Sequence, residues 1–185
     1  MILKYFYKVY FYLNRIYRIS CRFKKHEEFV WEDLKKLHKD AKWHCGIYEL
    51  NKTIETTFEI SENIGAVFFY MVEESCFHCR VKVLEHFSVE STSELFILAS
   101  HFNNILSNGV VKIDVYNNYV EYHLKRELLI PLLYNSEIYN QILRHLNTSK
   151  DVYAAFRRLV EEGEAPAVII ADLLNQKKNN EEGTE

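Results

Sequence analysis

Glycine and proline are scarce in this chain, which has five glycines and two prolines among 185 residues. The five glycines lie far apart, so the sequence contains neither the G-x-G-x-x-G fingerprint of dinucleotide-binding folds nor a P-loop, in which clustered glycines let the backbone approach a phosphate. It also lacks the G-x-S-x-G and H-E-x-x-H motifs of hydrolases and metalloproteases. These absences exclude the commonest loops that carry nucleotide and hydrolytic chemistry.

Cysteine is also sparse, and the irregular spacing of the four cysteines does not form the framework of a disulfide-rich secreted protein. We therefore expect a reducing compartment, the cytoplasm. Hydrophobic residues make up 48% of the chain and charged residues 26%, a composition typical of folded globular proteins. The length fits one domain with a substantial core.

One pair of cysteines, Cys76 and Cys79, has the C-x-x-C spacing of zinc and redox sites. The segment alternates like a strand, in which residues three apart point to opposite faces, and it lacks the Gly or Pro of a tight turn. The adjacent His44 and Cys45 would diverge in the same way. We interpret Cys79 as a core residue and Cys76 as a residue at a strand edge, and we expect no metal ion and no cofactor.

Histidine and glutamate form no recognisable catalytic arrangement. The eight histidines are scattered, and none is next to a nucleophile and an orienting acid. The Glu-Glu pairs at 27–28, 73–74 and 161–162 flank expected helices and strands, where charged residues are usually solvated. We therefore expect no catalytic residues and predict that the protein is not an enzyme.

The charge is unevenly distributed along the chain. Residues 1–25 contain seven Lys and Arg and no Asp or Glu, whereas the other 160 residues contain 16 basic and 26 acidic side chains, a net charge of −10. This pattern predicts a basic leader, residues 1–25, joined to an acidic domain, residues 26–176. Residues 177–185 are expected to form a disordered polar tail.

The leader has the periodicity of a basic amphipathic helix. At about 100° per residue, a sector of roughly 80° holds five cations: Lys4, Lys8, Arg15, Arg18 and Arg22. Apolar side chains gather on the opposite side: Tyr5, Val9, Tyr12, Ile16 and Phe23. The longest run without charge, Val9 to Asn14, is far shorter than the ~20 residues of a transmembrane helix. Such a helix binds an anionic membrane surface, packs on its own domain or a second subunit, or, least expected here, binds nucleic acid.

Residues 26–176 show both helical and strand patterns. Apolar residues at helical spacing predict helices at 28–39, 92–107, 138–146, 152–160 and 165–174. Alternating segments bounded by turn residues predict strands at 43–50, 53–60, 66–72 and 77–84. Ser91 and Glu94 form an S-x-x-E capping box at the start of the helix at 92–107, and Asn108-Gly109 is expected to end that helix.

A β-hairpin is predicted at 107–126, where apolar and polar residues alternate on both sides of Asn117-Asn118. A two-residue turn there gives an inner, apolar face with the pairs Val115–Val120, Ile113–Tyr122 and Val111–Leu124. The outer face then has the pairs Lys112–His123, Asp114–Glu121 and Tyr116–Tyr119. A one-residue slip would expose every apolar side chain, so the pattern specifies which face is buried and places Ile113 at the centre of that face.

These elements together predict an α+β fold, a single antiparallel sheet packed against the helix at 92–107 and the C-terminal helices. Runs of strands interrupted by one helix are typical of this class, whereas regular βαβ alternation would indicate a parallel sheet.

The stretch SELFILASHFNNILSNGVVKIDVYNNYVEYHLKRELL, residues 93–129, resembles the YbjN family. In this stretch an alanine-containing helix with an Asn near its end leads into a G-x-x-x-I-D-like strand. The resemblance covers roughly residues 53–174 and leaves the leader outside. Members of the family have folds similar to those of type III secretion chaperones. The resemblance therefore implies an α+β domain that binds protein and self-associates, and it supplies no catalytic residues.

Recognition is expected on the outer face of the hairpin, because the inner face is committed to the core. We place the interaction surface at Tyr116 and Tyr119, together with Lys112 and His123. Tyrosine gives a large amphipathic contact area and is enriched at protein interfaces. The alternative is that the two tyrosines cap the hairpin or contact the leader.

Two functions from different classes remain open. The first is a non-enzymatic, cytoplasmic protein-interaction module of a bacterial YbjN-like family, resembling secretion chaperones, with a protein partner, self-association and a regulatory role. The second is a peripheral protein on the inner face of the membrane, attached to anionic lipid through residues 1–25.

Overall fold

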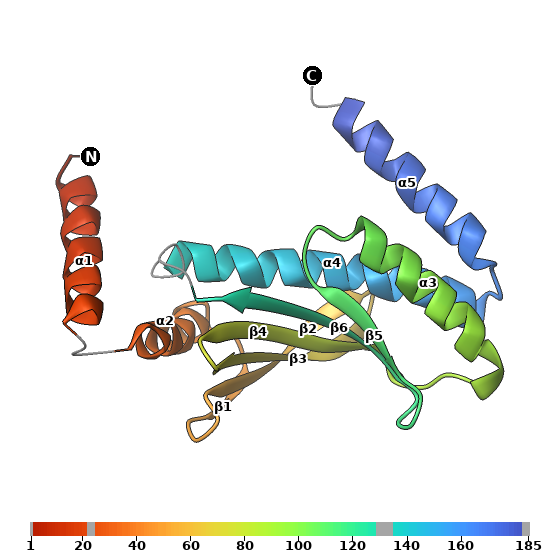
Figure 1. The fold of residues 1–185 in the computed structure, drawn as a ribbon, viewed down its shortest axis with the longest axis horizontal. Helices are drawn as coiled ribbons and strands as arrows, with labels where there is room; N and C mark the ends of the chain where they lie inside the picture. Colours follow the sequence, from red (N-terminus) through yellow and green to blue (C-terminus); the bar gives the residue numbers. More distant parts are fainter. Residues whose placement is uncertain (1, 22–24, 129–134, 183–185) are drawn as a thin grey trace. The chain divides into compact units, whose positions relative to one another are not determined.

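The computed structural model describes residues 2–21, 25–128 and 135–182. Its elements, in chain order, are α1 (Ile2–Ser20), α2 (His26–Asp40), β1 (Cys45–Tyr48), β2 (Thr53–Ser61), β3 (Ile64–Glu73), β4 (Cys76–Leu84), the short 3₁₀ turn η1 (Val89–Ser91), α3 (Thr92–Ile105), β5 (Val110–Asp114), β6 (Tyr119–Glu127), α4 (Asn135–Glu161) and α5 (Pro166–Glu182) (Figure 1). The strands form one antiparallel sheet in the order β1-β2-β3-β4-β6-β5. The predicted α+β fold with a single antiparallel sheet is confirmed.

Two compact units share this sheet. The first comprises Met1–Thr56, Phe69–Cys79 and Lys125–Arg144, and the second comprises Thr57–Phe68, Arg80–Leu124 and His145–Glu185. The long strands β2, β3, β4 and β6 contribute residues to both units, and so does α4.

In the first unit, α2 carries an apolar face with helical spacing, in which Val30 and Leu34 are fully buried. His38 continues this face. Its ring lies 5.1 Å from the ring of Trp43 and 5.7 Å from that of Tyr70, and its Nδ1–H donates to the Leu34 carbonyl over 2.9 Å. Burial lowers the pKa of His38, so it is a neutral aromatic member of this core.

Helix α4, which has residues in both units, runs without a break through the two helices predicted at 138–146 and 152–160. Its buried stripe, with alternating steps of four and three residues, is Ile138, Ile142, His145, Ser149, Val152, Phe156 and Leu159. His145 and Ser149 interrupt the apolar pattern and made the sequence look like two helices. The Ser149 hydroxyl donates to the His145 carbonyl over 2.6 Å, so this polar group is satisfied inside the helix.

The start of α3 differs from the predicted capping box. Ser91 makes no side-chain capping hydrogen bond, and the residue that caps is Ser88, whose hydroxyl accepts from the Glu90 amide over 3.2 Å at the start of η1. The helix ends at Ile105, before the predicted Asn108-Gly109, although Gly109 does take a positive φ of 81°. The 3₁₀ turn η1 leads directly into α3, and the S-x-x-E pattern does not predict such a turn.

The C-terminal helix α5 continues to Glu182. Part of the predicted polar tail, up to that residue, is therefore helical, while residues 183–185 lie outside the described part of the chain. Strand β6 ends at Glu127, one residue beyond the predicted hairpin, and residues 129–134 also lie outside the described part.

Candidate protein-interaction site on the hairpin

The hairpin β5–β6 closes with a four-residue turn, residues 115–118, where the sequence predicted two. Asp114 determines this turn, because its carboxylate accepts hydrogen bonds from the backbone N–H and the side-chain amide of Asn117, over 3.0 and 2.9 Å. The same bonds lower the pKa of Asp114. Asn118 then takes the left-handed conformation, with φ 53°. One positive φ is easier for Asn-Asn than the two that a tight two-residue turn requires.

The predicted register is wrong by two residues as a consequence. The observed pairs are Val110–His123, Val111–Tyr122, Lys112–Glu121, Ile113–Val120 and Asp114–Tyr119. A shift of two preserves the faces, so Val111, Val120, Tyr122 and Leu124 are buried as expected. Val115 leaves the core for the turn, and Ile113 is only half-buried. The predicted pair of Asp114 with Glu121 is not formed, because Asp114 is opposite Tyr119 and Glu121 is opposite Lys112.

The outer face of the hairpin borders a groove of about 470 Å³. It is lined by Arg80, Lys112, Ile113, Asp114, Val115, Tyr116, Tyr119 and Glu121. Arg80 and Glu121, which both line it, are paired: Glu121 Oε2 accepts from Arg80 Nε over 3.0 Å and from Nη2 over 2.7 Å. The Glu121 carboxylate is buried, and this hydrogen bonding raises the pKa of Arg80. The pairing restricts the movement of both side chains at the groove.

The two tyrosines occupy different places on this groove. Tyr116 lies in the turn and is 100% exposed, whereas Tyr119 begins β6 and is half-buried. The Lys82 ammonium lies 4.4 Å from the centroid of the Tyr119 ring, a cation–π contact. The predicted cross-strand pairing of the tyrosines is therefore wrong, but both line the same groove.

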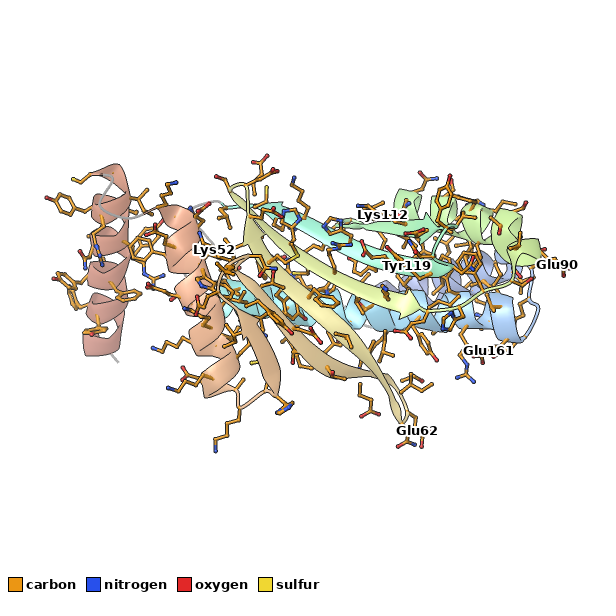
Figure 2. The ribbon with its side chains drawn as sticks, turned by 90° about the horizontal axis from the view of Figure 1, so that it is seen from below. Lys52, Glu62, Glu90, Lys112, Tyr119 and Glu161 are labelled. Atoms are coloured by element: carbon orange, nitrogen blue, oxygen red, sulfur yellow. The ribbon has the colours of Figure 1, made fainter. Side chains whose placement is uncertain are left out.

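Lys112 and His123, the other two residues predicted for the site, contact each other. Lys112 Nζ lies 2.9 Å from His123 Nδ1, and because an ammonium has only protons to donate, the imidazole nitrogen accepts. Figure 2 shows Lys112 and Tyr119 on the neighbouring strands of the hairpin. The sequence reasoning missed Arg80 and Lys82, which alternation in the strand at 77–84 already places on one face.

Each edge of the sheet has a distinct character. At the β5 edge, Asn103 of α3 binds the backbone of Val111 twice, donating Nδ2–H to the carbonyl over 3.0 Å and accepting the amide N–H over 2.7 Å. These are the groups that an added strand would use, so Asn103 opposes strand addition here. A second groove of about 580 Å³ lies between α3 and β5. The other edge, β1, exposes Ile47 and Tyr48.

The predicted membrane-surface cations do not behave as one set. Arg15 is 7% exposed and is bound to Asp33 of α2, with 2.7 Å between Nη2 and Oδ1. Its charge is thus neutralised inside the protein, contrary to the predicted surface role. Arg18 is exposed, with its guanidinium 5.4 Å from the Phe29 ring centroid. Arg22 and the side chains of Lys4 and Lys8 lie outside the described part of the structure.

Cys76, Cys79 and His145 lie in the core, whereas His44 is exposed and Cys45 is half-buried. Cys76 and Cys79 are both buried, and desolvation raises the pKa of the Cys79 thiol well above its ordinary value. His145 is stacked on Tyr122 and meets Phe68 edge-on. Residues 2–21, 25–128 and 135–182 contain no group of three or more His, Cys, Asp or Glu placed to hold a metal ion. Within the same residues, no helix combines the length and apolar character of a membrane span.

Comparisons with models of known protein families and with curated proteins give no match to this chain.

Proposed function

We propose that the protein is a non-enzymatic binding module that engages a protein partner through the hairpin groove. The observation that carries this proposal is the fully exposed ring of Tyr116 at the rim of a groove whose other aromatic residue, Tyr119, is fixed by Lys82. An exposed anchor beside pre-ordered neighbours is the arrangement found at interface hot spots, because little side-chain freedom is lost on binding.

The chemistry of the groove defines the partner that fits. Arg80 and Glu121 neutralise each other, and the Asp114 carboxylate accepts hydrogen bonds from Asn117 in the turn. Lys112 in the lining and Lys82 beside Tyr119 are exposed cations. Ile113 and the two tyrosines add apolar surface. The matching partner is a protein segment with an apolar or aromatic side chain flanked by carboxylates. The resemblance of residues 93–129 to the YbjN family, with its likeness to secretion chaperones, supports the same class of function.

A binding role also agrees with the state of the residues that an enzyme would use. Cys79 is a buried thiol with a raised pKa, so little of it is the nucleophilic thiolate. His38 and His145 are buried among aromatic rings with lowered pKa values, where they serve packing. None of these three lines the hairpin groove.

Site-specific photo-crosslinking in cells tests the proposal. A photoreactive amino acid replaces Tyr116 in one variant and Leu50 in the other. Leu50 is a matched control because it is also fully exposed, but it lies in a different turn and does not line the groove. We expect a discrete crosslinked protein from position 116 that is absent from position 50 and weakened by Lys112→Glu. The same products from both positions, or none from position 116, would contradict the proposal.

A further inference from the structure

Helix α1 exposes an apolar stripe to solvent. Phe6, Tyr10 and Leu13 are 68%, 69% and 58% exposed, and Tyr17 follows on the same side at 61%. The steps of four, three and four residues keep these side chains within an arc of about 60° along the helix. Four large side chains aligned in this way form a continuous exposed surface, which isolated surface residues would not. We call Phe6, Tyr10, Leu13 and Tyr17 the α1 stripe.

The α1 stripe is not the side by which the helix packs. Arg15, which lies roughly opposite the stripe on a helical projection, forms the buried ion pair with Asp33 of α2. The Arg15 guanidinium also lies 5.1 Å from the centroid of the Phe29 ring, and Tyr12 and Ile16 on the packed side are half-buried. Contacts within the first unit therefore hold α1 by one side and present the stripe on the other.

This arrangement differs from the apolar side predicted from the sequence. Of the five apolar residues placed opposite the cations, Tyr12 and Ile16 face the packed side and Val9 is exposed. Phe23 and the side chain of Tyr5 lie outside the described part of the structure. The α1 stripe is thus a second apolar surface. It was not predicted, because the sequence pattern was interpreted as one apolar side opposite the cations.

We infer that the α1 stripe lies in the headgroup region of an anionic lipid bilayer. Residues 1–25 contain no acid and six cations besides Arg15, whose charge is neutralised by Asp33, so their charge complements anionic headgroups. Two copies pairing stripe to stripe would instead bring two such segments within the screening length of about 8–10 Å, where they repel. Phenylalanine, tyrosine and leucine are the side chains that enter the headgroup boundary while cations remain at the surface.

The structure assigns different roles to the cations of the leader. Arg18 is exposed and available to a lipid phosphate, whereas Arg15 is committed to Asp33 and fixes the orientation of the helix. The helix lies along the bilayer surface, since one of its sides is occupied by α2. This surface is in the first unit and is independent of the hairpin groove, which is in the second.

Co-sedimentation of the full chain with vesicles tests the inference. Vesicles of phosphatidylcholine alone are compared with vesicles that also contain phosphatidylglycerol. We expect binding to the anionic vesicles only, and a loss of about tenfold or more on the double change Tyr10→Ser with Leu13→Ser, because the apolar surface drives insertion. Arg18→Glu should weaken binding and increase its sensitivity to salt.

Matched variants make the result specific. Tyr48→Ser removes a half-exposed tyrosine from β1 in the same unit and should leave vesicle binding unchanged. All variants should melt within a few degrees of the parent protein, because the replaced side chains are exposed. No binding to anionic vesicles, equal binding to neutral ones, or unchanged binding of the double variant would each overturn the inference. A stripe-dependent dimer in lipid-free sedimentation would also overturn it, since a second copy would then be the occupant.

Discussion

The ring of Tyr122 is stacked on the imidazole of His145, with 5.0 Å between the ring centroids and 16° between the planes. This pair joins β6 to α4 inside the second unit. The phenol of Tyr122 is satisfied separately, because its hydroxyl donates to the Asn108 carbonyl over 2.8 Å. The stacked imidazole is neutral, since burial lowers the pKa of His145 to about 3.

A pH-dependent stability follows from His145. Between its ordinary pKa of about 6.5 and its folded pKa of about 3, the unfolded chain binds a proton that the folded chain does not. The free energy of unfolding should therefore fall as the pH falls through this range, by at most about 5 kcal/mol from this residue. Urea unfolding at several pH values should show the fall, and His145→Phe, which retains a stacked ring, should reduce its slope. An identical slope for both proteins would contradict this assignment; His38 contributes in the same direction.

A second prediction concerns the stability of a variant at Gly109. A Cβ at this position would lie 2.7 Å from the Tyr122 ring, and φ is 81°, so Gly109→Ala should cost about 2 kcal/mol or more through strain and displacement of the ring. Gly163 is the matched control because its φ is also positive, at 68°, but no atom lies within 4 Å of its Cβ position. Gly163→Ala should cost less. If thermal unfolding showed the same loss of stability for both variants, the close approach of the Tyr122 ring would not contribute to the cost of Gly109→Ala.

The ion pair between Arg15 and Asp33 should control the docking of α1. Both side chains are buried, so Asp33→Ala leaves an uncompensated charge and should cost about 3–5 kcal/mol locally. The double replacement Arg15→Met with Asp33→Leu should recover most of this loss, since two apolar side chains need no partner. Hydrogen exchange of the α1 amides measures the docking directly. A double variant that exchanges as fast as Asp33→Ala would contradict the role of the pair.

Local patterns in the sequence were sufficient for most of the fold. The strands at 53–60, 66–72 and 77–84 alternate with a period of two, and the structure places β2, β3 and β4 over these residues. The single helix α4 was missed because His145 and Ser149 occupy core positions, and polar residues in a stripe look like an interruption. The burial of His145 depends on Phe68 of β3 and Tyr122 of β6, whose rings contact its imidazole.

Features of the candidate sites depended on interactions that no local pattern contains. The hairpin register followed from one side chain, Asp114, which selects a four-residue turn. Arg15 was read as a surface cation because its partner, Asp33, lies on a different helix. The periodicity of apolar residues identifies which residues share a face of a helix or strand. It does not identify which face another helix or strand will cover.

The register itself is testable by charge insertion. Val120 is 0% exposed, and its partner Ile113 is half-buried beside both grooves. Val120→Asp should therefore unfold the second unit or destabilise it by roughly 4 kcal/mol or more, because a buried carboxylate would have no partner. Ile113→Asp should be milder, and Lys112→Asp milder still. This order corrects the expectation that Ile113 is the centre of the core. If Ile113→Asp lowered the melting temperature as much as Val120→Asp, the register predicted from the sequence would be correct instead.

Separate replacement of the two groove tyrosines distinguishes recognition from folding. Tyr116 is fully exposed in the turn, so Tyr116→Ser should leave the melting temperature within about 2 °C of the parent, as expected for surface substitutions. Tyr119 contacts Lys82 and pairs with Asp114, so Tyr119→Ser should cost about 1 kcal/mol.

If the groove binds a protein partner, Tyr116→Ser should nevertheless weaken the complex by about tenfold or more, as loss of a tyrosine anchor does at interface hot spots. Tyr116→Phe is the matched control, since it retains the ring and removes only the hydroxyl. It should bind nearly as well as the parent in a titration against the partner captured from position 116. A Tyr116→Ser variant with unchanged affinity would show that the exposed ring does not contribute to binding, and the function assigned to this groove would then be wrong.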